Sequence, residues 1–420
     1  MNLKIAFAQG QKGENMGLPM GPGLEPISLA INGVQRARIY TIGAAPKGGK
    51  TTLTDVGFII EPLMYVINHN HPFIQRRVEI EKILETETSI EVRQKLNQEY
   101  ELCGNNIIYI NYIYFSYEID RVTKEFDFMA HFLYRDYGIL HIPLPEGKTY
   151  KKRSYVEVSS QYLKGELVYD NPDPQVREMI RVSPEIEEKM IRIYYDRIIP
   201  IFGEYDDFGK KIKNGHINFQ ENKENPTGIR NFLLEYARQN GTFVEEVKFT
   251  AEQKQERRLV GYKPKNSKLI TVIVTDHLRK LIPERGFKLK ETVDKFSEYA
   301  VELRNLCQFT FVNIIHLNRA IADASRRKLD GDRLYPMSDD IKETGNLSED
   351  SNYIFTMFNP NDDKFGLTKH FGTPIRDTKG RLLYPNMRTI HLVESRHCEA
   401  PQHFRVNMLG NIKKFETLTL

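Results

Sequence analysis

The stretch "ARIYTIGAAPKGGKTTLTD", residues 37–55, decides the fold of this chain. Its first part, residues 37–44, is short, apolar and β-branched, which predicts a buried strand. Small residues and Gly-Lys-Thr follow, and residues 50–63 then have the pattern of a helix. A strand, a glycine-rich loop and a helix in this order form the context in which phosphate-binding loops occur.

The loop has the residue types that bind a nucleoside triphosphate. Small residues let backbone N–H groups wrap the phosphates, a lysine reaches the outer phosphates, and a hydroxyl holds Mg²⁺. Ala44 stands where the usual motif has its first glycine, but it is small enough to serve there if its backbone angles are ordinary. We therefore expect ATP and Mg²⁺ as cofactors; the alternative is a glycine-rich turn beside a surface lysine. The residues expected to bind the nucleotide are Ala44, Ala45, Pro46, Lys47, Gly48, Gly49, Lys50, Thr51 and Thr52.

Length and composition set the class of protein. The chain has 420 residues, of which 40% are hydrophobic and 28% charged, enough for one large domain or two ordinary ones with a buried core. The net charge of +4 is mild, so any nucleic-acid site must come from a local basic cluster. Cys103, Cys307 and Cys398 follow no metal-ligand spacing, and no apolar run is long enough to cross a membrane. We expect a cytoplasmic protein without disulfides or a signal peptide.

The rest of the chain predicts an α/β fold. Further buried strands are expected at residues 106–116, 268–276 and 309–317, and two apolar segments, 389–395 and 404–409, lie near the end. Helices are expected at residues 76–102, 120–138, 225–241 and 290–307. Strands that alternate with helices favour a mostly parallel central sheet flanked by helices. The glycine- and proline-rich start predicts an arm or linker at residues 1–26, followed by one domain at 27–420 with an insertion at about 139–224.

Two acidic residues follow predicted strands. Asp276 ends the run "LITVIVTD", where an ATPase with a phosphate-binding loop carries its magnesium-side carboxylate. Glu118 lies just past the strand at residues 106–116, where it is either a solvated side chain or the group that positions the attacking water. Two histidines in "NHNHPF", His69 and His71, lack a third ligand at useful spacing, which predicts a surface turn and no metal site.

An ordered set of segments resembles the DnaB-type replicative helicases, a branch of the RecA-fold ATPases. "FSYE", ending in Glu118, is similar to that family's Phe-Ser-Leu-Glu, and residues 225–241 resemble the helix before its acidic strand. Residues 316–355 resemble its Gln-Leu-Asn-Arg segment and the acidic stretch that follows, and "VESR", ending in Arg396, resembles its Lys-x-Arg motif. These matches span residues 25–416. The chain lacks the separate N-terminal helical domain of cellular members, as a short phage or plasmid form would.

The resemblance implies a ring, most simply a hexamer, that hydrolyses ATP and moves along single-stranded DNA. It implies that Lys50 binds phosphates, that Thr51 and Asp276 hold Mg²⁺, and that Glu118 activates water. His316 replaces the family's γ-phosphate-sensing Gln, which opens a response to pH, and Glu394 replaces its finger Lys, while Arg396 is retained as the finger. A primase or a helicase loader is the partner protein that the family implies.

Two basic loops correspond to the family's channel loops, which contact the DNA backbone without reading its sequence. The alternative is that both loops are merely solvated, as we expect for the basic run at 150–153. The residues expected to bind DNA are Arg279, Lys280, Arg285, Lys288, Lys290, Arg326, Arg327, Lys328 and Arg333. Two other functions remain open: a RecA-like recombination or repair ATPase that forms filaments, and a nucleotide-bound scaffold with little turnover.

Overall fold

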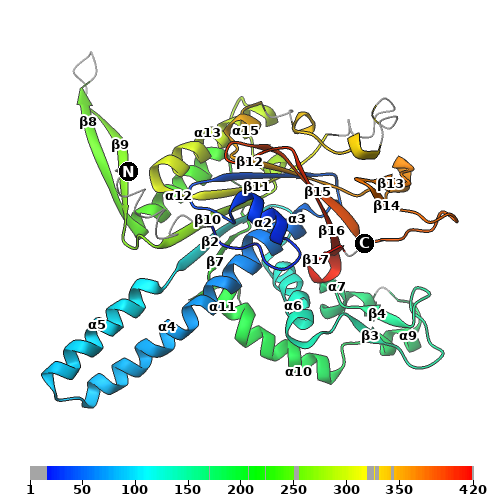
Figure 1. Cartoon of the computed structure of the whole chain (residues 1–420), viewed down its shortest axis with the longest axis horizontal. Coiled ribbons are helices and arrows are strands. Elements are labelled where there is room, and N and C mark those ends of the chain that lie inside the picture. The colour runs from blue at the N-terminus through cyan, green and yellow to red at the C-terminus, as the bar shows by residue number, and fades with distance from the viewer. Residues whose placement is uncertain are drawn as a thin grey trace.

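The computed structural model describes residues 17–418 apart from 170, 207, 223, 250–254, 319–325, 327–330 and 342–344. In this part of the chain, nine strands form one sheet in the order β17-β16-β15-β12-β1-β11-β10-β2-β7 (Figure 1). Their bounds are β1 Ile39–Ala44, β2 Tyr109–Ser116, β7 Ile217–Gln220, β10 Leu269–Asp276, β11 Thr310–His316, β12 Tyr353–Phe358, β15 Met387–Ser395, β16 Gln402–Leu409 and β17 Lys414–Thr417.

The direction of the strands fixes which residues can meet. The strands from β12 through β1, β11, β10 and β2 to β7 are parallel, whereas β12, β15, β16 and β17 pair antiparallel. The expected α/β fold with a mostly parallel sheet is therefore confirmed. The carboxyl ends of the parallel strands share one edge of the sheet, which we call the carboxyl edge. The carboxyl end of β15 lies at the opposite edge, the amino edge.

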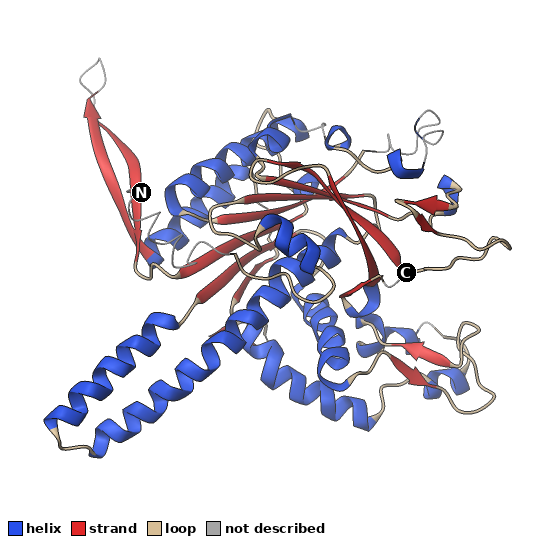
Figure 2. Cartoon of the chain, in the orientation of Figure 1, coloured by secondary structure: helices blue, strands red, loops and turns tan. Residues whose placement is uncertain are grey.

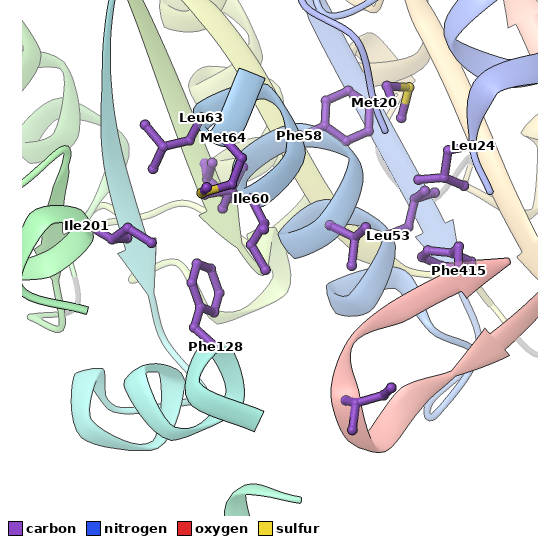
Figure 3. Packing of buried hydrophobic residues seen from close by; sticks show 14 of the residues in the cluster. Met20, Leu24, Leu53, Phe58, Ile60, Leu63, Met64, Phe128, Ile201 and Phe415 are labelled. Carbon is purple, nitrogen blue, oxygen red and sulfur yellow. The ribbon is translucent and has the colours of Figure 1, made fainter. Parts of the chain in front are cut away.

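Helices cover both faces of the sheet (Figure 2). Alternate residues of a strand point to opposite faces, so Tyr112 and Tyr114 of β2 belong to one core and Ile113 and Phe115 to the other. The first core also contains Phe58 and Phe128, which Figure 3 shows with neighbouring apolar side chains. Around it lie α3 Lys50–Leu53, the π-helical turn η1 Thr54–Ile60, α4 Glu61–Thr86 and α6 Arg121–Tyr137, whereas the second core contains α12 Pro226–Asn240 and α13 Leu289–Cys307.

The helices after the phosphate-binding loop differ from the prediction. The helix expected to end at residue 63 continues to Thr86, and the single helix expected at 76–102 is instead a hairpin of α4 and α5 Ile90–Asn106 (Figure 1). The break comes at residues 87–89, where the chain is extended and the Ser89 hydroxyl accepts a hydrogen bond from the Val92 N–H, an N-cap that periodicity alone does not locate. His69 and His71 lie inside α4, so the predicted surface turn is wrong.

The expected arm at residues 1–26 is described only from Gly17 onward, and that part is packed. Leu18, Met20 and Leu24 are buried in the first core, and α2 Glu25–Ile31 follows them. Gly57 makes room for this contact, because a Cβ there would lie 2.6 Å from the Met20 methyl carbon. The composition of the segment correctly predicts a loop, but burial joins it to the domain.

The segment expected to be an insertion contributes to the core. It contains two short hairpins, β3 His141–Pro143 with β4 Tyr155–Glu157 and β5 Gly203–Tyr205 with β6 Lys211–Asn214. Its last strand, β7, pairs with β2 at the edge of the main sheet, so the predicted boundary at residue 224 is wrong. Its helices are α7 Ser160–Leu163, α8 Glu166–Tyr169, α9 Pro174–Met179, α10 Pro184–Ile193, the π-helical turn η2 Tyr194–Ile198 and α11 Ile199–Phe202.

A projecting hairpin was not predicted from the sequence. It consists of β8 Gly241–Phe249 and β9 Gln255–Pro264, which pair antiparallel and extend away from the sheet (Figure 2). Smaller elements on the other side of the molecule are α15 Gly345–Asp350, β13 Lys369–His370 and β14 Thr373–Pro374. None of the helices in the described ranges is long and apolar enough to span a lipid bilayer.

Candidate nucleotide site

The loop between β1 and α3 has the backbone of a phosphate cradle. Lys47 and Gly49 adopt left-handed angles, with φ of 60° and 100°. A Cβ on Gly49 would lie 2.5 Å from the Met408 sulfur, so this position requires glycine for both space and conformation. Ala44 is the last residue of β1 and has an ordinary strand conformation, which explains why alanine is tolerated at the motif's first glycine position.

Lys50 begins α3 and points into a site with two carboxylates nearby. Burial lowers its pKa, while the charges of Asp276 and Glu118 act in the opposite direction. A buried ammonium group at the start of a helix, below a ring of backbone N–H groups, suits the outer phosphates of a nucleotide.

Thr51 and Asp276 lie together on adjacent elements. The Thr51 hydroxyl is 3.4 Å from Asp276 Oδ2, and Asp276 is almost fully buried at the end of β10. Its other oxygen, Oδ1, is buried and has no hydrogen-bond partner among the described residues. A hydroxyl and a carboxylate oxygen without a partner fit a hard divalent cation such as Mg²⁺.

Glu118 reaches the same edge from the end of β2. Its side chain is 34% exposed, and Glu118 Oε1 lies 3.0 Å from His277 Nε2. The His277 ring in turn contacts the His316 ring edge to face, with centroids 4.4 Å apart. The structure therefore brings Lys50, Glu118, Asp276 and His316 to one edge of the sheet.

His277 is a member of this site that the sequence analysis did not identify. It directly follows Asp276, and the only signal for it was this adjacency to a strand-end carboxylate. Burial lowers its pKa, with the Glu118 and Asp276 charges opposing the shift. The Arg279 backbone N–H donates to His277 Nδ1 over 3.3 Å, so Nδ1 carries no proton and the neutral ring donates through Nε2 to Glu118.

The same three side chains offer donor atoms that a transition metal would use. One ligand atom each from Glu118, His277 and His316 lie within 4.8 Å of one another. His277 Nε2, however, carries the proton that it donates to Glu118, and a metal would need that nitrogen free. The hydrogen bonds of His277 thus favour an oriented carboxylate at this place over a metal centre.

His316 is neutral near pH 7 in this structure. Burial, followed by the charges of Lys50 and His277, lowers its pKa to about 4. A pH response of His316 in the physiological range, which its replacement of glutamine suggested, is therefore not supported by its surroundings.

Arg396 lies at the other edge of the sheet. It follows β15, its backbone N–H donates to the Asn352 carbonyl, and it lines a hollow with Arg38, Arg304 and His397. Arg38 directly precedes β1, whose far end leads into the phosphate-binding loop. Since a strand of this length spans about 20 Å, Arg396 does not serve the nucleotide site of its own chain.

The basic residues after β10 surround the carboxyl edge. Arg279 and Lys280 lie in the 3-10 turn η3 Leu278–Lys280, and the side chains of Lys280, Arg285, Lys288 and Lys290 are exposed. The second basic loop is only partly described. Arg326 forms an ion pair with Asp340 at 2.6 Å and donates to the Tyr335 carbonyl, while Arg333 is exposed. Arg327 and Lys328 lie outside the described residues. The run at 150–153 is mostly exposed, as expected.

Comparison with solved structures gives matches over nearly the whole chain. The ATPase domain of one DnaB-like helicase matches with a TM-score of 0.55 and 12% identity, covering 99% of this chain and 97% of that one. A DnaB-like replicative helicase, in a structure that describes its interactions with primase, matches with a TM-score of 0.52 and 12% identity, covering 99% of this chain and 66% of that one. No protein-family model and no curated protein matches the sequence. The chain therefore has the RecA-like fold of the ATPase domains of DnaB-like replicative helicases.

Proposed function

We propose that this protein is an ATP-dependent DNA helicase that assembles as a ring and moves along single-stranded DNA. One observation carries the proposal: Lys50, Thr51, Asp276 and Glu118 converge at the carboxyl edge, directly beside the basic segment that follows β10. The RecA-like fold and the likeness to DnaB-like helicase ATPase domains support it.

The residues of the carboxyl edge have separate roles in hydrolysis. The loop N–H groups and Lys50 bind the phosphates, and Thr51 and Asp276 would hold Mg²⁺, which neutralises phosphate charge when bound. Glu118, held by His277, polarises a water molecule whose oxygen attacks the γ-phosphorus while the bond to the bridging oxygen breaks. His316, beside His277, senses the γ-phosphate and relays its state to the second basic loop.

The remaining charge stabilisation comes from a second protomer. Arg396 is too far from Lys50 to act within one chain, but the amino edge of a neighbour in a ring would present it to the nucleotide. An arginine that reaches the γ-phosphate oxygens stabilises the charge that develops during transfer. A hexamer is the closed form that we propose, and a primase or a helicase loader is the class of partner protein that it would take.

The decisive experiment is an ATPase assay with and without single-stranded DNA, on the wild type and on Lys50→Ala. We expect stimulation by DNA in the wild type and no turnover in the variant. Rings in electron micrographs with nucleotide and DNA would favour the helicase, whereas filaments would favour a recombination ATPase. Absence of any ATP turnover would leave the nucleotide-bound scaffold.

A further inference from the structure

A buried chain of polar side chains runs behind the nucleotide site. The Tyr114 hydroxyl of β2 lies 3.2 Å from Asp276 Oδ2, and Lys124 Nζ of α6 lies 3.0 Å from the same hydroxyl. Lys124 Nζ is also 3.1 Å from each carboxylate oxygen of Asp55, which belongs to the helix after the phosphate-binding loop. Tyr114, Lys124 and Asp55 are all buried.

The donors and acceptors in this chain fix its direction. A lysine ammonium group has three N–H donors and no acceptor, and here the three have Asp55 Oδ1, Asp55 Oδ2 and the Tyr114 oxygen as partners. The Tyr114 oxygen must accept from Lys124, so its own proton is free to point at Asp276 Oδ2. Burial, with the nearby Asp276 and Asp55 charges, raises the pKa of Tyr114 well above its ordinary value, which keeps that proton in place.

A second lysine balances the charge of the cluster. Lys413, just before β17, lies 3.4 Å from Asp55 and 3.2 Å from Asp127 of α6. Two lysines therefore face two aspartates. Burial lowers the pKa of Lys413, but the two carboxylates outweigh burial and the net shift is upward. A buried cluster with matched charges holds its geometry, because moving one member would leave a buried charge unpaired.

The consequence appears at Asp276. Tyr114 and Thr51 both point at Oδ2, which leaves Oδ1 buried and without a partner among the described residues. Resting on the proposed function, we infer that Tyr114 and Lys124 are positioning residues that hold Asp276 with Oδ1 turned toward the divalent cation. A purely structural tie between β2 and β10 would not require that one oxygen be occupied and the other free.

The test is the Mg²⁺ dependence of nucleotide binding, measured with a fluorescent ADP analogue on the full chain. Tyr114→Phe removes the hydroxyl and keeps the ring. We expect the Mg²⁺ concentration at half-effect to rise by about 10- to 100-fold, as for other groups that orient a metal ligand. Affinity for the analogue in the presence of a chelator should stay unchanged.

Tyr112→Phe is the matched control. Tyr112 lies on the same strand, faces the same core and is equally buried, but its hydroxyl donates to the Ile59 carbonyl, away from Asp276. An equal Mg²⁺ dependence in both variants and the wild type would overturn the inference, as would an equal weakening in both variants. If the wild type shows no Mg²⁺-dependent nucleotide binding, the proposed function fails, and the inference fails with it. A shift confined to Tyr114→Phe supports both.

Discussion

The two edges of the sheet hold charge in opposite ways. At the carboxyl edge, Lys50 lies near Asp276 and Glu118, and behind them two lysines and two aspartates balance each other in the core. At the amino edge, Arg38, Arg304 and Arg396 line one hollow together with His397. Burial lowers the pKa of Arg304, and the charge of Arg396 lowers it further. One edge is prepared for a phosphate with its cation, whereas the other concentrates positive charge.

The difference suggests how the protein divides its chemistry. The carboxyl edge has groups for binding and for water activation, but the guanidinium groups gather at the far end of β1. Like charges held close together lose stability until an anion joins them. A neighbouring protomer's nucleotide would supply that anion, so each site is complete only between copies.

Loss of the finger should have the largest effect on turnover. Arg396→Ala should reduce the rate of ATP hydrolysis by about 10³- to 10⁵-fold, because the transition-state charge on the γ-phosphate oxygens loses its partner. Nucleotide affinity measured on the unassembled protein should not change. The control is Arg381→Ala, which removes an exposed arginine paired with Asp377 and should leave the rate unaltered.

A mixing experiment tests whether the two edges meet between copies. Arg396→Ala and Lys50→Ala subunits, each inactive alone, should regain some activity when mixed, since some interfaces then join an intact loop to an intact finger. Activity per protomer should also rise with protein concentration. An Arg396→Ala protein that assembles and hydrolyses ATP normally would remove Arg396 from the site.

Glu118→Gln should act on the carboxyl edge alone. The amide cannot take a proton from water, so we expect turnover to fall by about 10²- to 10⁴-fold while ATP affinity is kept. Glu146→Gln, an exposed carboxylate in the loop after β3, is the control. Parallel loss of affinity and turnover in Glu118→Gln would instead indicate a structural role.

Local patterns in the sequence were enough to predict the phosphate-binding loop and the strands that flank it. The position of Asp276 and Glu118 at one edge also follows, since the carboxyl ends of parallel strands meet there. The antiparallel end of the sheet and the entry of β7 depend on pairing between distant segments, which periodicity does not report.

The missed residues share a physical cause. His277 reaches Glu118 only because β10 and β2 are adjacent and in register. Lys413 reaches Asp55 across more than 350 positions of sequence, and Tyr114 looks like any aromatic residue of a buried strand until its hydroxyl is placed. Contacts of this kind belong to the assembled core and have no signature in a short window.

The basic segment after β10 sharpens the comparison, because its charge lies in solvent beside the nucleotide site. Replacing Lys280, Arg285 and Lys290 by glutamine should weaken binding to all single strands alike. Each lost phosphate contact lowers the slope of log affinity against log salt by about 0.7, so the slope should fall by about 2. Lys148, Lys151 and Lys152, exposed on the distant β3–β4 hairpin, form a control triple that should leave the slope unchanged. An unaltered slope in the first triple would place DNA elsewhere.

The smallest effect concerns the histidine at each edge. Since burial and Lys50 lower the pKa of His316 to about 4, this ring stays neutral as the pH falls, until the pH approaches that value. The pH profiles of ATP hydrolysis for the wild type and His316→Gln should therefore be parallel between about pH 5.5 and 8. A wild-type ionisation near the ordinary histidine pKa that His316→Gln abolishes would contradict this.

His397 should behave differently when the ring forms. Burial, followed by the charges of Arg38, Arg396 and Arg304, lowers its pKa in the single chain. An incoming phosphate offsets the arginine charge and favours the protonated ring, so its pKa should rise on assembly with nucleotide. Imidazole chemical shifts recorded against pH, on dilute and assembled protein, measure this directly. His316 should show no comparable upward shift when protein is concentrated without nucleotide, because Lys50 of its own chain remains beside it. If the pKa of His397 does not change on assembly with nucleotide, no phosphate has entered the arginine hollow, and the division of the site between two edges would be wrong.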